Sequence, residues 1–143
     1  MELKLKLAIL LFGMLCTGLT AGLCFTWGNA ITPGIGRLDD LSFLKSFQAM
    51  NRAIINRTFL IVFFSPALVL FLNAYLFKNS GISFWIFLAA AALFFIGMAL
   101  VTIFGNVPLN EILDKSSLEF LSTIELKALR QKFERPWNQW HLV

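Results

Sequence analysis

Three polar side chains near the ends of apolar stretches are of types that can accept a proton or donate hydrogen bonds to a reacting group. His141 is the only histidine of the chain, and an imidazole, which titrates near neutral pH, can act as a general base. Asn106 and Asn110 flank Pro108 in the sequence VTIFGNVPLN, residues 101–110. Because a proline ends or kinks a helix, these asparagines can bond freed backbone groups or face a ligand. The alternative for His141 is an ordinary position at a membrane interface, beside two tryptophans.

Further polar residues are expected in the same layer as these three. Gln48 and Asn51 come from a predicted loop helix, and Asn138 comes from the C-terminal motif that contains His141. We expect Trp137 and Trp140 to anchor the membrane interface, with stacking on a bound molecule as the alternative. With stacking as the reason for including Trp137, the candidate substrate-binding set is Gln48, Asn51, Asn110, Trp137 and Asn138, beside the candidate catalytic pair His141 and Asn106.

Metal and nucleotide chemistry fit the sequence poorly. One histidine and two cysteines, Cys16 and Cys24, are too few for a closed zinc site in one chain. We therefore expect no metal site. The chain has no glycine-rich nucleotide loop and no Ser-His-Asp order, and its net charge of +4 comes without a basic run interleaved with aromatics, so no nucleic-acid partner is expected.

The elements that must position these residues are membrane helices. The chain has 143 residues, of which 58% are hydrophobic and only 14% are charged, far below the charged fraction of soluble domains. Three uncharged runs, 7–27, 58–77 and 82–104, are each long enough to cross a hydrocarbon core of roughly 30 Å. These runs predict an all-α transmembrane bundle in a single domain, multi-pass and with lipid around it. The expected location is a bacterial inner membrane.

Small and polar residues within the spans predict how the helices meet. Gly18 and Gly22 form a G-x-x-x-G motif, at which another helix can approach closely. We expect Asn73 to bond to a neighbouring helix, and we expect Pro66 to kink the second span. The short connection at 78–81 makes the second and third spans an antiparallel hairpin.

Two amphipathic helices are predicted outside the spans, over about 38–56 and 117–133. The first has Phe43 and Phe47 on its apolar face and lies along the interface or caps the bundle. Capping boxes begin at Ser116 and Ser122, so we expect two short helices in succession there. Arg130 is expected to pair with Glu134 on the surface.

Pro136 is predicted to be the first residue of a new helix, and the chain stops soon after it. We therefore expect a fourth span to be missing, with the bundle completed by a second copy or by a partner helix. Nine of the twelve basic residues lie in the first loop and after the third span, which favours both regions in the cytoplasm and the N-terminus outside, whereas Lys4 and Lys6 favour the N-terminus inside. These nine are Arg37, Lys45, Arg52, Arg57, Lys115, Lys127, Arg130, Lys132 and Arg135.

Three motifs occur in an order and spacing that resemble a known family. They are Gln48-Ala-Met-Asn-Arg52 followed by Asn56, then VTIFGNVPLN, then Phe133-Glu-Arg-Pro-Trp-Asn-Gln-Trp-His141. This resembles the DUF1772 family, also called the anthrone oxygenase-like proteins, over nearly the whole chain.

The resemblance implies a small multi-pass membrane protein, usually with four helices. It further implies oxidation of an anthrone to an anthraquinone by molecular oxygen without a recognised cofactor, so no cofactor is expected. In that chemistry His141 would remove a proton, and Asn106 and Asn110 would donate hydrogen bonds to a carbonyl that becomes an enolate. The apolar substrate would be an aromatic or quinone-like small molecule. The alternatives are a non-enzymatic accessory subunit and a protein that only binds a hydrophobic ligand.

Overall fold

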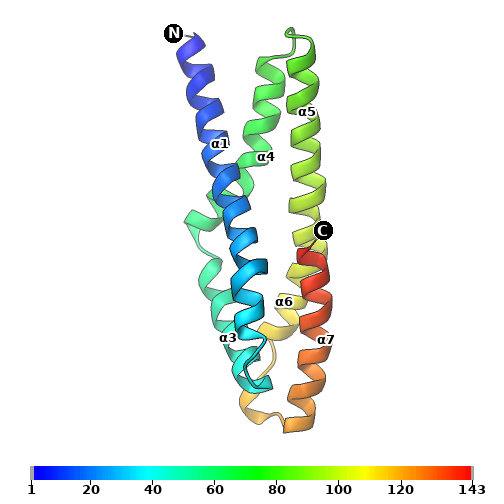
Figure 1. Cartoon of the computed structure of the whole chain (residues 1–143). Helices are drawn as coiled ribbons and strands as arrows, with labels where there is room; N and C mark the ends of the chain where they lie inside the picture. The colour runs from blue at the N-terminus through cyan, green and yellow to red at the C-terminus, as the bar shows by residue number, and fades with distance from the viewer. Residues whose placement is uncertain (1, 143) are drawn as a thin grey trace. The chain divides into compact units, whose positions relative to one another are not determined.

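The protein is helical throughout the part that the structure describes. The computed structural model describes residues 2–142, and no strand occurs in that range (Figure 1). Three helices are long and apolar enough to cross a membrane, namely Lys4–Ile35, Arg57–Leu76 and Ile82–Asp114. The expected all-α fold and its three spans are confirmed, and they fit a membrane protein.

Two of these helices continue beyond their predicted ends. The first consists of α1 (Glu2–Thr26), the π-helical segment η1 (Trp27–Ile31) and α2 (Thr32–Ile35). The third consists of α5 (Ile82–Phe94), η2 (Phe95–Leu100), η3 (Thr102–Asn106) and α6 (Val107–Asp114).

The predicted helix break at Pro108 is therefore wrong, and the first long helix likewise runs on through Pro33. Each of these prolines comes just after a π-helical segment, η3 or η1, at the first or second position of the next α-helical segment. The hydrogen-bond register changes at such a junction, so a residue without an N–H is tolerated there and the helix runs on.

The chain forms two compact units. Unit 1 takes Arg57–Ala99 together with the residues up to Leu23, and unit 2 takes Cys24–Asn56 together with the residues from Leu100 on. The arrangement of the chain as one integral membrane domain stays a prediction.

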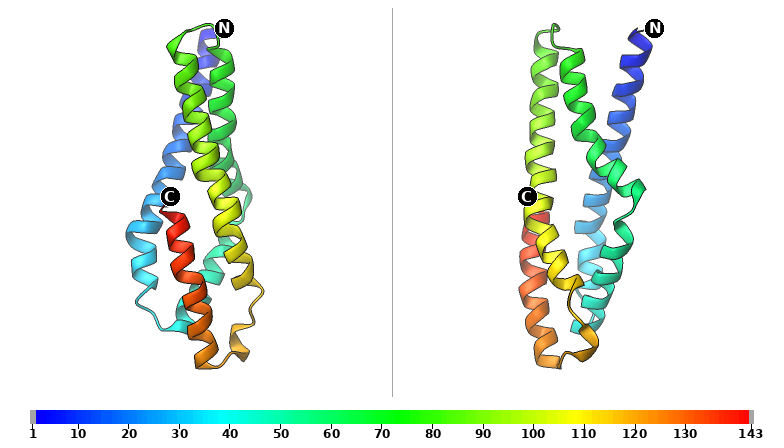
Figure 2. Two further views of the ribbon diagram at one scale, coloured as in Figure 1. Left: turned by 90° about the vertical axis from the view of Figure 1, so that its right-hand side faces the viewer. Right: turned by 180° about the vertical axis from the view of Figure 1, so that it is seen from behind.

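Unit 1 contains the expected helical hairpin. The helices α4 (Arg57–Leu76) and α5 run antiparallel, side by side, and the green connection between them is short (Figures 1 and 2). Gly81 at the end of this connection has a φ of 54°, a conformation that favours glycine. The structure thus confirms the hairpin.

A hydrogen bond between α1 and α4 compensates for the proline inside α4. Pro66 has no N–H, so the carbonyl of Val62, four residues earlier, lacks its intrahelical donor. The hydroxyl of Thr20 donates to that carbonyl over 3.1 Å, and Thr20 is only 1% exposed. In a bilayer, a neighbouring helix is the usual source of a replacement donor. This bond joins two helices far apart in sequence at a backbone position that the proline leaves without a donor.

The close approach of helices in unit 1 occurs at a different glycine from the one predicted. A Cβ added to Gly18 or Gly22 would meet no described atom within 4 Å, so the expected contact at the G-x-x-x-G motif is not made there. A Cβ added to Gly13 would instead lie 2.6 Å from Cγ1 of Val69. Gly13 is therefore the position at which α1 can approach α4 closely.

Unit 2 has an aromatic core around α3 (Asp40–Ile54). Asp39 caps this helix, its side chain accepting from the Ser42 amide, and Phe43, Leu44 and Phe47 are fully buried. The predicted helix is confirmed, and its apolar face packs against α7 (Thr123–His141). The core consists of Trp27, Phe43, Leu44, Phe47, Leu113, Leu118, Leu126, Phe133 and Trp137.

The helix α7 begins at a capping box and then runs through a proline. The Ser122 hydroxyl accepts from the Glu125 amide, and the Glu125 carboxylate accepts from the Ser122 amide. The pKa of Glu125 is held below its usual range because its carboxylate accepts from the Ser122 hydroxyl and from the Ser122 amide. The box predicted at Ser116 is wrong, since only the short 3-10 segment η4 (Leu118–Phe120) follows it. The new helix predicted at Pro136 is also wrong, because Pro136 lies inside α7.

Arg130 joins α7 to the start of α3, and its expected pair with Glu134 is formed but is partly buried and not on the open surface. Its side chain is only 15% exposed, and its guanidinium lies over the ring of Phe43, 4.4 Å from the centroid. It donates to the Glu134 carboxylate over 2.7 Å, and this bond is the largest cause that raises the pKa of Arg130. Further donated bonds reach the carbonyls of Gly36 and Leu38 and the carboxylate of Asp40. Arg130 thus bonds to the connection between α2 and α3 at Gly36 and Leu38, and to the first residue of α3, Asp40.

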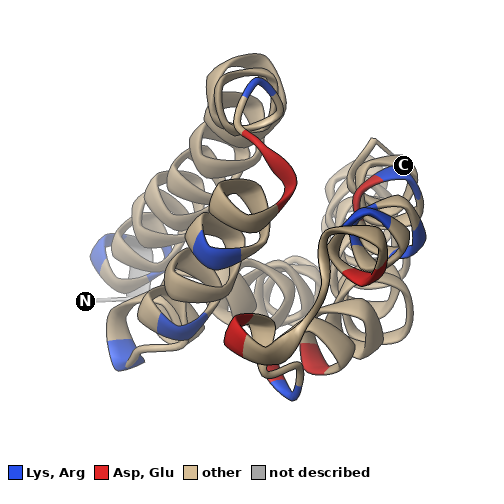
Figure 3. Ribbon diagram, turned by 90° about the horizontal axis from the view of Figure 1, so that it is seen from below, with Lys and Arg blue, Asp and Glu red and all other residues tan. Residues whose placement is uncertain are grey.

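Other charged side chains of unit 2 form exposed pairs. Lys45 lies near Glu119, and Arg52 donates to Asp114. Basic and acidic segments lie beside one another in the view from below (Figure 3). Exposed pairs of this kind contribute little to stability.

Replacement of Thr20 tests the bond that compensates for Pro66. We expect Thr20→Val to lower the free energy of unfolding by about 1–2 kcal/mol, because the Val62 carbonyl then has no donor. In the Pro66→Ala background, the new alanine supplies that carbonyl with an N–H, so the same Thr20→Val change should cost little. Thermal unfolding in detergent gives the free energy of unfolding of the unmodified protein, of the two single variants and of the double variant. Equal costs in the two backgrounds would show that Thr20 does not act through Val62.

Arg130→Lys tests whether the planar guanidinium is required. A lysine cannot reach both backbone carbonyls and both carboxylates in one geometry, so we expect a loss of about 1–3 kcal/mol in the free energy of unfolding. The matched control is Arg135→Lys, on the same helix but exposed, with an expected change within about 0.5 kcal/mol. Equal effects of the two changes, measured by thermal unfolding, would contradict the role of Arg130.

Candidate functional site

The last turns of α7 bring most of the predicted site residues together. Phe133, Trp137 and His141 follow one another at intervals of four residues, so they share a face of this helix. Figure 2 shows α7, in orange and red, running between the blue segment that precedes α3 and the yellow segment of η3 and α6. This face of α7 is where the chemistry predicted from the sequence would take place.

Trp137 is the centre of this cluster. It is buried, and its ring meets those of Phe47 and Trp27 with centroids 4.9 and 5.6 Å away. Its indole N–H donates to Oδ1 of Asn110 over 2.7 Å, and its carbonyl accepts from Nδ2 of Asn106 over 3.1 Å. Both asparagines of VTIFGNVPLN therefore bond to Trp137, Asn110 at the indole ring and Asn106 at the backbone carbonyl.

The π-helical segment η3 places the backbone of this motif close to α7. A Cβ added to Gly105 would lie 2.6 Å from Cδ2 of Trp140, so only glycine permits this approach. Asn106, the last residue of η3, is 5% exposed and turns its amide toward α7. π-Helical turns in long helices occur often at functional sites.

His141 lies against Trp137 and is bonded to the first apolar helix. The two rings are stacked, with centroids 5.0 Å apart and an interplanar angle of 17°. Nε2 of His141 lies 3.1 Å from the carbonyl oxygen of Cys24. A carbonyl oxygen can only accept a hydrogen bond, so Nε2 carries the hydrogen in this contact. In the neutral ring, Nδ1 is then the nitrogen with a free lone pair, which is what a general base requires.

Gly28 lies beside the histidine ring. A Cβ added to Gly28 would be 3.8 Å from the ring atoms Cδ2 and Nε2, which is an ordinary contact distance. The segment η1 therefore lies beside the His141 ring at Gly28.

The other predicted site residues lie elsewhere in unit 2. Nε2 of Gln48 donates to the carbonyls of Leu113 and Ser116 over 2.8 and 3.0 Å, at the end of α6. Asn51 is buried in α3. The structure therefore brings Asn106, Asn110, Trp137 and His141 into contact, and it uses the amide of Gln48 to close the end of a helix.

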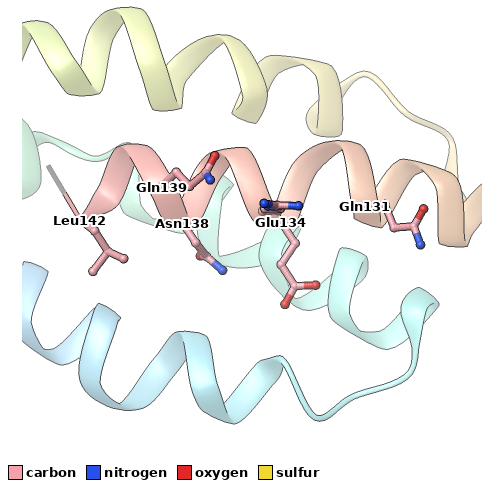
Figure 4. A pocket seen from close by; sticks show the side chains of 6 residues that line it. Gln131, Glu134, Asn138, Gln139 and Leu142 are labelled. Carbon is pink, nitrogen blue, oxygen red and sulfur yellow. The ribbon is translucent and has the colours of Figure 1, made fainter.

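Asn138 lines an open pocket on α7. The pocket has a volume of about 660 Å³ and is lined by polar side chains and Leu142 (Figure 4). In the close-up, Glu134, Asn138 and Leu142 point toward the blue segment below α7. The lining residues are Gln131, Glu134, Arg135, Asn138, Gln139 and Leu142.

Two groups that contact this cluster, the Trp27 side chain and the Cys24 carbonyl, were not predicted from the sequence. Trp27 packs against Trp137 and Phe47, and its buried indole nitrogen has no hydrogen-bond partner among the described residues. The Cys24 carbonyl that holds His141 belongs to the backbone, so no residue type signals it. The position of Trp27 at the end of an apolar run was the one available signal.

Comparison with known proteins gives one match. No curated protein and no solved structure matches the chain. The family model described as anthrone oxygenase matches residues 47–143, a range that contains the four clustered residues Asn106, Asn110, Trp137 and His141. Because this match extends over more than half of the sequence, the chain belongs to the anthrone oxygenase family.

Proposed function

We propose that the protein is a membrane-embedded oxidoreductase that oxidises an anthrone or a similar apolar aromatic molecule, with molecular oxygen as the oxidant. The observation that supports it best is the contact of His141 with Trp137 and Cys24, which leaves Nδ1 free as a base in an aromatic setting. Membership of the anthrone oxygenase family supports the same chemistry.

The reaction needs a base at its first step. The methylene carbon of an anthrone gives a proton to Nδ1 of His141, and the carbanion is stabilised because the negative charge moves to the carbonyl oxygen and the central ring becomes aromatic. Oxygen then accepts electrons from this carbanion. In total, the methylene carbon loses two hydrogens and gains one oxygen atom, and the second oxygen atom leaves with both hydrogens as water.

Asn106 and Asn110 are the proposed donors to the enolate oxygen. Each amide nitrogen has two hydrogens, and the contacts with Trp137 use one hydrogen of Asn106 and the carbonyl oxygen of Asn110. The remaining N–H groups can stabilise negative charge that develops on the substrate. The buried indole N–H of Trp27 is a further donor in the same aromatic cluster.

The substrate would reach the protein from the lipid phase. Three apolar helices long enough to cross a membrane support a multi-pass protein, and we propose the bacterial inner membrane as its location. A flat aromatic molecule partitions into that phase and meets apolar side chains there.

His141→Gln tests the base. The glutamine amide can still donate to the Cys24 carbonyl, so the variant should fold, but it has no nitrogen that takes up a proton. We expect turnover of anthrone to fall by about 100-fold or more, as is usual when a general base is removed. Oxygen consumption and the absorbance of anthraquinone measure the rate, corrected for uncatalysed oxidation.

Lys132→Gln is the matched control for this experiment, because Lys132 is exposed on the same helix and does not line the pocket that contains Asn138. It should retain the rate of the unmodified protein. A wild-type rate in His141→Gln would remove His141 from the mechanism, and an unmodified protein no faster than uncatalysed oxidation would refute the proposed function itself.

A further inference from the structure

The helices α3 and α7 meet through aromatic rings. Phe43 and Phe47 lie on the face of α3 that turns toward α7, and Phe133 and Trp137 lie on the facing side of α7. Phe47 packs between the two rings of α7, with its centroid 4.6 Å from that of Phe133 and 4.9 Å from that of Trp137. These contacts establish which side of each helix faces the other.

One polar residue follows the last ring on each helix. Asn51 comes four residues after Phe47, and His141 comes four residues after Trp137. Each therefore lies one turn beyond the aromatic contact, on the facing side of its own helix. The rings of Phe47, Trp137 and Trp27 are in mutual contact, with centroids 4.9–5.6 Å apart, and offer an apolar surface next to both polar residues.

The amide of Asn51 is unpaired but accessible. Its side chain makes no hydrogen bond to any described residue, and the residue keeps 9% of its surface exposed. Neither the oxygen nor the nitrogen of this amide is fully enclosed by protein. A mostly buried amide without a partner is costly, so a bound molecule that accepts from its nitrogen gains free energy.

Asn73, the buried asparagine of unit 1, differs from Asn51 in both respects. Its Nδ2 donates to the Val69 carbonyl within the same helix over 3.0 Å, so the expected bond to a neighbouring helix is not made. Its Oδ1 has no partner among the described residues, but this atom is enclosed by protein and out of reach of a ligand. Asn51, unlike Asn73, has an amide that a bound molecule can reach.

We propose that Asn51 is a catalytic residue of the oxidation, and that its Nδ2–H donates to the oxygen molecule as it is reduced. This role rests on the proposed function. A flat substrate between α3 and α7 turns one face toward His141 and the other toward Asn51. The base removes a proton from the first face of the methylene carbon, so oxygen bonds to the same carbon from the second face.

The oxygen step creates negative charge at this second face. The carbanion passes one electron to oxygen, and the resulting superoxide and carbon radical combine in a C–O bond. The peroxide anion takes up one proton, which replaces the one that His141 removed. Loss of the second methylene proton and cleavage of the O–O bond then give the ketone and hydroxide, which is protonated to water.

A fixed donor beside superoxide and peroxide lowers the barrier to their formation, and it is most effective in an apolar setting. Asn51 thus serves the oxygen, whereas Asn106 and Asn110 are the proposed donors to the enolate oxygen of the substrate. The sequence predicted Asn51 only as a substrate-binding residue.

Two rates separate the base from the oxygen step. Anthrone with a deuterated methylene exchanges deuterium for hydrogen from water when His141 acts as a base, and this exchange needs no oxygen. With the full chain in detergent, we expect Asn51→Leu to leave the exchange rate under argon within about twofold and to lower kcat/KM for oxygen about 10- to 100-fold. His141→Gln should lower both rates.

Asn79→Leu is the matched control, since it is the same change at an exposed residue of unit 1. Both of its rates should equal those of the unmodified protein. Asn51→Asp is a second variant that keeps the shape of the side chain but replaces the donor by a carboxylate, which repels reduced oxygen. It should lower kcat/KM for oxygen at least as much as Asn51→Leu while exchange continues, and it decides the test if Asn51→Leu fails to fold.

Two outcomes would overturn the role of Asn51. One is unchanged oxygen kinetics in a folded variant at this position. The other is an equal fall in exchange and oxidation, which would place Asn51 in the proton step or in the structure alone. An unmodified protein that accelerates neither exchange nor oxidation would instead refute the proposed function, and the role of Asn51 with it.

Discussion

The need to pair backbone carbonyls determines much of this structure. A chain with many apolar helices and several prolines leaves carbonyl oxygens that no intrahelical N–H can reach, and each needs a donor. Within unit 1, Thr20 supplies the donor that the Val62 carbonyl lacks because of Pro66. Within unit 2, side chains also donate to backbone carbonyls of other elements: His141 to Cys24, Gln48 to Leu113, and Arg130 to Gly36. Because the donors come from distant parts of the sequence, each bond also fixes a tertiary contact.

In the cluster around Trp137, side chains also bond to a backbone carbonyl, and here the bonds hold an aromatic ring in place. Asn106 satisfies the Trp137 carbonyl while Asn110 accepts from its indole N–H, so Trp137 is held at both ends. A ring held in this way gives His141 a fixed surface on which to stack. Preorganisation of this kind keeps a catalytic group in one geometry before a substrate arrives.

Apolar runs and their lengths were enough to predict the three long helices, and the capping box at Ser122 was enough to predict the start of α7. The continuation through Pro33 and Pro108 could not be predicted, because sequence does not show where a π-helical turn moves the hydrogen-bond register. The continuation of α7 through Pro136 has no such turn beside it and was not predicted either. The motifs did predict four residues that meet in unit 2, whereas the burial of Arg130 and the unpaired oxygen of Asn73 depend on tertiary packing.

The bond between Thr20 and the Val62 carbonyl has a consequence for sequence divergence. Thr20 is needed only while position 66 is a proline, and a proline there is tolerated only while position 20 has a hydroxyl. Homologues that have lost one should be free to lose the other. Positions 20 and 66 should therefore change together during evolution, although no direct contact between their side chains is required.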